Sequence, residues 1–175
     1  FGDSELSYNY RMTEFAGALG KVGLKKLDIQ NNIRIENALL LSYLLKDNEF
    51  LTVRMCNKSE KCVYYAVLLE LKKDIPNLDS RLENLQNKGI FIRKTWDPLH
   101  THPHFNPGSV IPSRGLPWRN GNYDGSMQNL QYKKLMLKNV TNYCPHKIFE
   151  MYVHPPVGED LIKISATEIN KQFSM

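Results

Sequence analysis

The chain has 175 residues, of which 42% are hydrophobic and 23% are charged, and these proportions are typical of a globular domain with its own core. The net charge of +5 suits an anionic ligand, but no arginine-rich or aromatic-interleaved run indicates a nucleic-acid partner. No apolar run could span a membrane and no signal peptide is visible, so we expect a cytoplasmic protein. Three cysteines without close metal-binding spacing argue against a disulfide scaffold: Cys56, Cys62 and Cys144.

A polar turn followed by a long helix is predicted near the start of the chain. Thr13 is a candidate N-cap, and Glu14 then lies where the helix dipole favours a negative charge. Apolar residues recur at helical spacing up to about Asp47, and Gly20 and Gly23 predict a bend in so long a helix. Because glycine is unfavourable inside a helix, these small residues indicate close packing against another backbone.

Asn9 and Arg11 place one neutral and one charged hydrogen-bond donor beside this turn. Such groups can hold a phosphate or a carboxylate. A structural role is the alternative, in which Asn9 caps the turn and Arg11 belongs to a surface ion pair. The residue pattern alone leaves both interpretations open.

The rest of the chain alternates between strands and helices. Strands are predicted for four stretches rich in β-branched and aromatic residues, 50–55, 63–71, 90–96 and 147–153. Helices are predicted at 126–140, from 166 to 173, and at 80–87, where Leu82 and Leu85 face inward and Gly89 supplies a left-handed cap. This order predicts the α/β class, with an α+β layer in which helices cover one face of an antiparallel sheet.

Three histidines alternate in the stretch that follows Trp96. If the stretch were a strand, His100, His102 and His104 would share one face, and neutral imidazoles are good metal ligands. Two prolines within the stretch argue against a regular strand. A metal-binding domain and a plain surface loop therefore both remain as interpretations.

A long stretch punctuated by glycine and proline follows, at 106–125. Loops of this length in a compact domain are often functional, so we expect a flap over a ligand, with Arg114 or Arg119 near a phosphate. A flexible surface insertion is the alternative.

Several motifs share the order found in one enzyme family. They are Tyr8-Asn9-Tyr10-Arg11-Met12-Thr13-Glu14-Phe15, Arg34-Ile35-Glu36-Asn37-Ala38, Lys88-Gly89-Ile90 and Trp96-Asp97-Pro98-Leu99-His100. Together they resemble the DegT/DnrJ/EryC1/StrS sugar aminotransferases, which depend on pyridoxal phosphate. The resemblance is strong from Tyr8 to about His100 and weak beyond that point.

The resemblance implies the C-terminal small domain of a fold-type I enzyme. Residues 1–47 would form a helix region at the interdomain and dimer interface, and residues 48–175 the small domain. The activity implied is transfer of an amino group from an amino acid, typically glutamate, to a keto group of a nucleotide-linked sugar, as in cell-surface polysaccharide biosynthesis. The cofactor would be pyridoxal phosphate and the enzyme a homodimer.

The resemblance also assigns roles to individual residues. Asn9 would reach the cofactor phosphate across the dimer, and Arg11 would meet an anionic substrate or donor. His100 would contact the sugar nucleotide. Trp96 stands where the family often has tyrosine, and its indole can still stack on a sugar or a base.

Family members carry the cofactor lysine in an upstream half, and nothing in this sequence matches that segment. We therefore expect no catalytic residue in this chain, and we expect the enzyme to need the upstream half. Some relatives replace the lysine of that half and act as dehydratases. A non-catalytic sugar-nucleotide-binding or interaction module of the same family is the alternative function.

Overall fold

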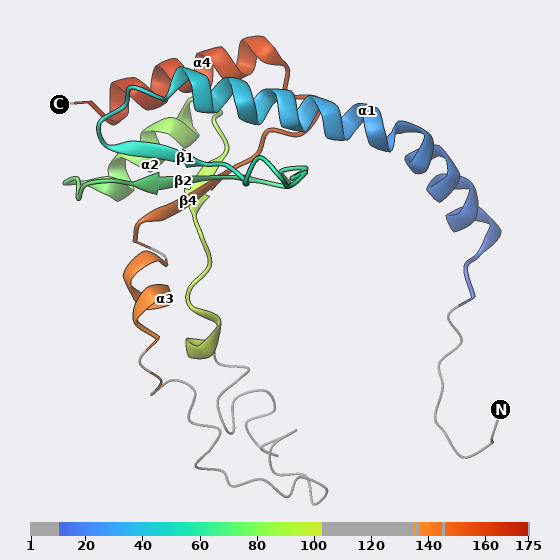
Figure 1. Cartoon of the computed structure of the whole chain (residues 1–175), viewed down its shortest axis with the longest axis horizontal. Helices are drawn as coiled ribbons and strands as arrows, with labels where there is room; N and C mark the ends of the chain where they lie inside the picture. The colour runs from blue at the N-terminus through green and yellow to red at the C-terminus, as the bar shows by residue number, and fades with distance from the viewer. Residues whose placement is uncertain (1–10, 103–134, 136, 145, 175) are drawn as a thin grey trace, which may run out of the picture.

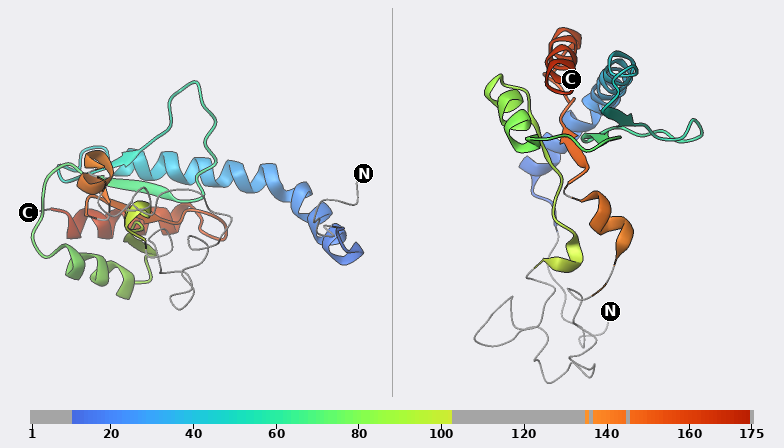
Figure 2. Two further views of the ribbon diagram at one scale, coloured as in Figure 1. Left: turned by 90° about the horizontal axis from the view of Figure 1, so that it is seen from below. Right: turned by 90° about the vertical axis from the view of Figure 1, so that its left-hand side faces the viewer.

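The computed structural model describes residues 11–102, 135, 137–144 and 146–174 (Figure 1). Its centre is a four-stranded antiparallel sheet of β1 (Leu51–Arg54), β2 (Val67–Leu71), β3 (Ile92–Lys94) and β4 (Ile148–Met151), in the order β1-β2-β4-β3. Helices α1 (Glu14–Leu44), α2 (Leu78–Asn87) and α4 (Glu159–Gln172) cover the same face, as the right panel of Figure 2 shows. The predicted antiparallel sheet with helices on one face is confirmed.

Helix α1 begins where the sequence predicts. The side chain of Thr13 accepts a hydrogen bond of 3.2 Å from the backbone N–H of Ala16, and Glu14 lies in the first turn. The helix continues without interruption through Gly20 and Gly23 for 31 residues, and its N-terminal part curves away from the domain (Figure 1). It is therefore one helix, of which only the C-terminal half lies over the sheet.

The core lies between the sheet and the three helices. Asn37 of α1 is buried and donates two hydrogen bonds of 2.8 Å, to the carbonyl oxygens of Val153 and Val157. These bonds tie the helix to the segment between β4 and α4. Around them pack buried apolar side chains from every layer, including Ala38, Leu41, Leu51, Leu69, Leu85, Ile92, Phe149, Ile162, Ile169 and Phe173.

The end of α2 follows the predicted capping pattern. Leu82 and Leu85 are buried, and Gly89 adopts the left-handed conformation with φ of +79°. The backbone N–H of Gly89 donates to Gln86 at 2.8 Å, and that of Ile90 donates to Leu85 at 3.1 Å. These two bonds form the glycine-terminated motif that satisfies the last carbonyls of a helix.

Three predicted elements differ from the observed bounds by more than two residues at one end. The second strand starts at Val67 rather than at 63, because Tyr64 adopts a left-handed conformation with φ of +47° that breaks the extended run. The helix predicted at 126–140 is wrong at Leu135 and Leu137, which precede α3 (Lys138–Tyr143), while 126–134 and 136 lie outside the described residues.

The last helix begins at Glu159, not at 166 as predicted. Ile162, Ala166 and Ile169 recur at helical spacing and form the buried side of α4. Acidic residues in the first turn, Glu159 and Asp160, suit the positive end of the helix dipole. Among the helices of the described ranges, none is long and apolar enough to cross a membrane.

Candidate functional site

The structure separates the predicted site residues into two groups. Asn9, Arg114 and Arg119 lie outside the described ranges. Arg11 is exposed and lies two residues before the N-cap Thr13, at the distal end of α1. Trp96 and His100 lie in the segment after β3, on the opposite side of the molecule from the start of α1 (Figure 1). Within one chain, Arg11 is therefore far from Trp96 and His100.

The segment that carries the histidines is not a strand. Leu99–Thr101 forms a short 3-10 helix, η1, in which the hydroxyl of Thr101 donates to the carbonyl of Pro98 at 2.7 Å. The alternation that would align three histidines on one face is therefore wrong at His100, and His104 lies outside the described part. Within that part, no group of three or more His, Cys, Asp or Glu residues could hold a metal ion.

Trp96 is 75% exposed and lies beside a charged pair on the open face of the sheet. The guanidinium of Arg93 in β3 lies 5.1 Å from the Trp96 ring and makes an ion pair with Glu150 of β4. Glu150 is only 8% exposed, and the hydrogen bond that Arg93 donates to it raises the pKa of Arg93. Since guanidinium does not lose its proton in proteins, this pair orients neighbouring groups and transfers no protons.

An aromatic cluster extends from Arg93 along the same end of the sheet. Arg93 lies 5.9 Å from the ring of Phe91, which stacks on Tyr152 with ring centres 4.6 Å apart. The hydroxyl groups of Tyr152 and Tyr65 are 3.5 Å apart, and this hydrogen bond raises the pKa of Tyr152. The open face thus presents aromatic rings held by an ion pair, an arrangement suited to binding flat or apolar surfaces.

The sequence reasoning missed this arrangement. Arg93 and Glu150 face each other because β3 and β4 are antiparallel with these two residues in register. The local signals were a glutamate between two apolar residues in one predicted strand and an arginine followed by a lysine in the other. Pairing two strands that are 57 positions apart cannot be read from such a signal.

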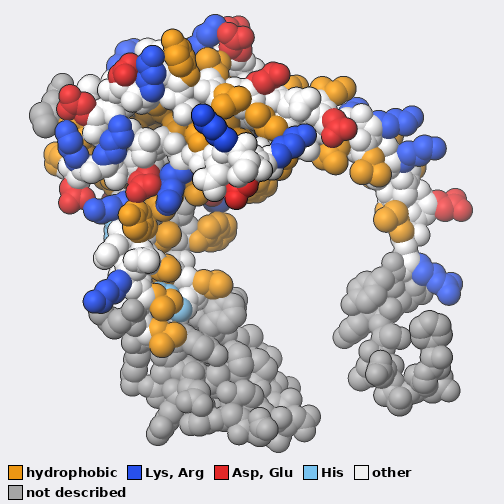
Figure 3. All heavy atoms as spheres, in the orientation of Figure 1, with side chains coloured by type: hydrophobic (Ala, Val, Ile, Leu, Met, Phe, Trp, Pro, Cys, Tyr) orange, Lys and Arg blue, Asp and Glu red, His pale blue; other side chains and the backbone are white. Residues whose placement is uncertain are grey.

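The N-terminal half of α1 is apolar but uncovered. Figure 3 shows hydrophobic side chains along this arm of the molecule. A Cβ atom added at Gly20 or Gly23 would meet no described atom within 4 Å, so the close packing predicted at these glycines is not made inside the described part of the chain. The exposed large apolar residues of this half are Phe15, Leu19, Val22, Leu24, Leu27 and Ile29.

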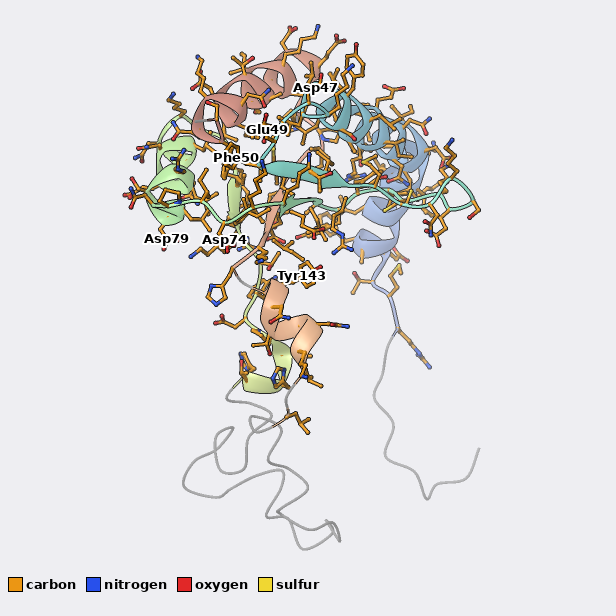
Figure 4. All side chains as sticks on the ribbon, turned by 60° about the vertical axis from the view of Figure 1, so that its left-hand side comes forward. Asp47, Glu49, Phe50, Asp74, Asp79 and Tyr143 are labelled. Carbon is orange, nitrogen blue, oxygen red and sulfur yellow. The ribbon has the colours of Figure 1, made fainter. Side chains whose placement is uncertain are left out.

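Two hollows on the described surface are lined by carboxylates. One, of about 480 Å³, is lined by Asp47, Glu49 and Phe50 at the turn between α1 and β1, where Figure 4 labels them. Another, of about 630 Å³, lies between α1 and the start of α4 and is lined by Glu36 and Glu159. Carboxylates repel a phosphate, so neither of these two hollows suits a phosphate-bearing cofactor.

Comparison with known families explains both the fold and the motifs. The sequence profile of the DegT/DnrJ/EryC1/StrS aminotransferase family matches residues 1–138. The chain belongs to this family. Curated protein sequences give no match to this aminotransferase-family chain.

Solved structures of aminotransferases and related enzymes share its fold. PseC of Helicobacter pylori, an aminotransferase involved in the biosynthesis of pseudoaminic acid, has a TM-score of 0.74 at 19% identity over 97% of this chain and 40% of its own. DesV of S. venezuelae has a TM-score of 0.66 at 13% identity over 100% of this chain and 40% of its own.

A dehydratase is also similar. The E. coli GDP-4-keto-6-deoxy-D-mannose-3-dehydratase with bound hydrated PLP has a TM-score of 0.57 at 21% identity over 93% of this chain and 36% of its own. At these identities the likeness establishes the fold. This family member spans about 40% of the length of PseC and of DesV.

Proposed function

We propose that this chain is the C-terminal part of a pyridoxal phosphate-dependent aminotransferase that moves an amino group from an amino acid, typically glutamate, to a keto group of a nucleotide-linked sugar. The observation that carries this proposal is the family match over residues 1–138. It is supported by structural neighbours such as PseC, an aminotransferase involved in the biosynthesis of pseudoaminic acid, and by the PLP-bound dehydratase. When bound, the cofactor carries the amino group between donor and acceptor.

In this proposal the chain's own residues bind and orient, and the proton-transferring lysine belongs to an upstream half of the enzyme. Asn9 donates to the cofactor phosphate, and Arg11 holds a carboxylate or phosphate through its planar fork of donors. Trp96 stacks on the sugar or base, His100 hydrogen-bonds the sugar nucleotide, and Arg114 neutralises a phosphate.

The distance of Arg11 from Trp96 and His100 in one chain is consistent with a site shared between subunits. We propose that a second copy and the upstream half cover the apolar N-terminal half of α1, and so bring Arg11 of one subunit toward the pocket of another. Uncovered apolar residues along a helix are typical of such an interface. In this arrangement the enzyme works as a homodimer in the cytoplasm.

The proposal is tested on the protein isolated from its native source. We expect an intact mass larger than this chain, or a second chain, together with the visible absorbance of bound pyridoxal phosphate, which glutamate should remove. A colourless protein whose whole mass equals these 175 residues would contradict the proposal, and would favour the non-catalytic module that binds sugar nucleotides.

A variant pair separates binding by Arg11 from a structural role. Arg11→Ala should abolish most activity of the coloured holoenzyme while leaving its unfolding transition unchanged, and Arg11→Lys should also be poor because an ammonium lacks the bidentate fork. Lys61→Ala, in an exposed loop, is the matched charge-removal control. Unfolding of the Arg11→Ala protein would instead assign Arg11 to a structural ion pair.

A further inference from the structure

The loop between β1 and β2 carries two of the three cysteines. It projects well beyond the sheet in the left panel of Figure 2. Cys56 follows the end of β1 by two residues and is half-buried, whereas Cys62 is exposed. Between them the backbone N–H of Glu60 donates to Asn57 at 2.9 Å, which reverses the direction of the chain.

The Cys56 thiol is held on the inner side of this turn. Its Sγ lies 3.5 Å from the carbonyl oxygen of Glu60 and 3.4 Å from the hydroxyl of Tyr64. Cys62 follows Glu60 by two residues, so its Cα lies within about 10 Å of the Cys56 sulfur by chain geometry. The two thiols therefore lie on either side of one short turn.

Tyr64 supports the same placement. Its ring is buried, its hydroxyl also accepts a hydrogen bond of 3.4 Å from the backbone of Cys56, and its backbone has a φ of +47°. Burial raises the pKa of Tyr64, the side chains of Cys56 and Cys62 raise it further, and the hydrogen bond from the Cys56 backbone lowers it. Both cysteines thus act on the same phenol.

Metal binding is a poor use for this pair, since the described ranges contain no third ligand beside it. Disulfide formation needs the two sulfurs and contact with an oxidant in solution, and the exposed Cys62 provides that contact. A disulfide requires Cα atoms about 5.5 Å apart, so the loop has to close until the two cysteines reach that distance.

We propose that Cys56 and Cys62 are a dithiol that closes reversibly into an intramolecular disulfide. A thiolate of the pair attacks a low-molecular-weight disulfide and releases one small thiol. The second cysteine then attacks the mixed disulfide and releases the other small thiol. The pair loses two protons and two electrons, and the oxidant is reduced to two thiols. Closing the loop replaces the Cys56–Tyr64 contact.

Peptide mapping of the full-length protein tests the proposal. The protein is equilibrated with oxidised glutathione, quenched with N-ethylmaleimide and digested with trypsin without reduction. Cleavage after Arg54, Lys58 and Lys61 separates the two cysteines, so peptides 55–58 and 62–72 stay together only through a Cys56–Cys62 bond. We expect this linked pair, and a loss of the two free peptides of about tenfold or more, because the second step is intramolecular.

Cys144 provides the matched control. Its peptide, 139–147, should remain mostly alkylated, and Cys144→Ser should keep the 55–58/62–72 link, whereas Cys56→Ser and Cys62→Ser should each remove it. Separate glutathione adducts on both peptides, a link to Cys144, or a disulfide that joins two protein molecules on a non-reducing gel would overturn the proposal. The peptide map of the wild-type protein alone decides between these outcomes, so the test holds even if a serine variant folds poorly.

Discussion

The two halves of α1 have similar apolar content and opposite surroundings. In the C-terminal half, Ala38 and Leu41 are fully buried against the sheet and α4, and Asn37 is hydrogen-bonded to the segment after β4. In the N-terminal half, Phe15 and Leu19 are among a series of large apolar side chains that remain exposed. One continuous helix thus joins an anchored part to an uncovered part.

The difference shows that burial in this chain follows from partners and not from the helix sequence itself. Phe15, Leu19 and Val22 follow one side at i, i+4 and i+7, while Leu24 and Leu27 fall on the opposite side. A helix that is apolar on two sides is normally buried on both. The N-terminal half is therefore suited to two covering surfaces, consistent with the proposed second subunit and upstream half.

Leu41→Ala should show the largest effect, because it empties part of the anchored core. We expect a loss of about 2–5 kcal/mol in the free energy of unfolding of the 175-residue chain. Denaturant titration followed by circular dichroism measures it. A loss below about 1 kcal/mol would mean that the C-terminal half is not anchored as described.

Asn37→Ala tests the polar part of the same anchor. Removing the amide leaves the carbonyls of Val153 and Val157 without their 2.8 Å partners, so we expect a loss of about 1–3 kcal/mol. The exposed Asn32 offers a matched control, since Asn32→Ala removes the same group from the same helix without buried bonds. Equal losses in the two variants would show that the tie to the segment after β4 is unimportant.

Gly23→Ala should have the opposite sign. The added methyl group meets no described atom within 4 Å, and alanine is the better helix former, so the 175-residue chain should gain about 0.5–1 kcal/mol. In the assembled enzyme the same methyl group should weaken association if another backbone packs there. Denaturant titration measures the stability of the isolated chain, and analytical ultracentrifugation measures the association of the assembled enzyme. A less stable isolated Gly23→Ala chain would contradict the exposed placement of Gly23.

Glu168→Gln tests a smaller, pH-dependent contribution to stability from α4, the helix that packs against the anchored half of α1. Hydrogen bonds from Lys171 at 2.6 Å and from Lys88, the residue that follows α2, lower the pKa of Glu168 below its ordinary 4.5. Because the pKa of Glu168 is lower in the folded protein, its contribution to stability is complete above about pH 4.5. It is lost as the pH falls through the pKa that Glu168 has in the folded protein. The variant should therefore be less stable than wild type at pH 7, and the gap should close below pH 4.5. A gap that is constant with pH would exclude the charge as its cause.

Leu19→Ala should have the smallest effect in the isolated chain, within about 0.5 kcal/mol, because the side chain is already exposed. It is the direct counterpart of Leu41→Ala on the same helix. A loss comparable to that of Leu41→Ala would show that the N-terminal half is packed in solution, and would abolish the contrast between the two halves.

Local signals in the sequence predicted the elements with distinctive ends. Thr13, Glu14 and Gly89 act through groups within four residues, so the start of α1 and the end of α2 could be read directly. The strand bounds were less accurate, since the left-handed backbone of Tyr64 has no clear sequence signature. The last helix was predicted too short, although Ile162, Ala166 and Ile169 recur at helical spacing and so extend the pattern toward its start.

The site was harder to predict than the fold. The Arg93–Glu150 pair depends on strand register between segments far apart in sequence, and neither residue belongs to a family motif quoted above. Trp96 and His100 were proposed through the resemblance, but the separation of the segment after β3 from the start of α1 became visible only in three dimensions (Figure 1). A sequence names candidate groups, whereas the distances between them depend on how the chain folds and assembles.

The anchor at Asn37 makes α1 a lever arm. From Asn37 to Glu14 the helix extends about 35 Å at 1.5 Å per residue. A tilt of only about 5° at the anchor moves the far end by about 3 Å, which is the whole length of a hydrogen bond. The position of Arg11 therefore depends less on the fold of its own domain than on the surfaces that pack against the N-terminal half of α1. Any binding by Arg11 requires that those surfaces hold this half of the helix rigidly.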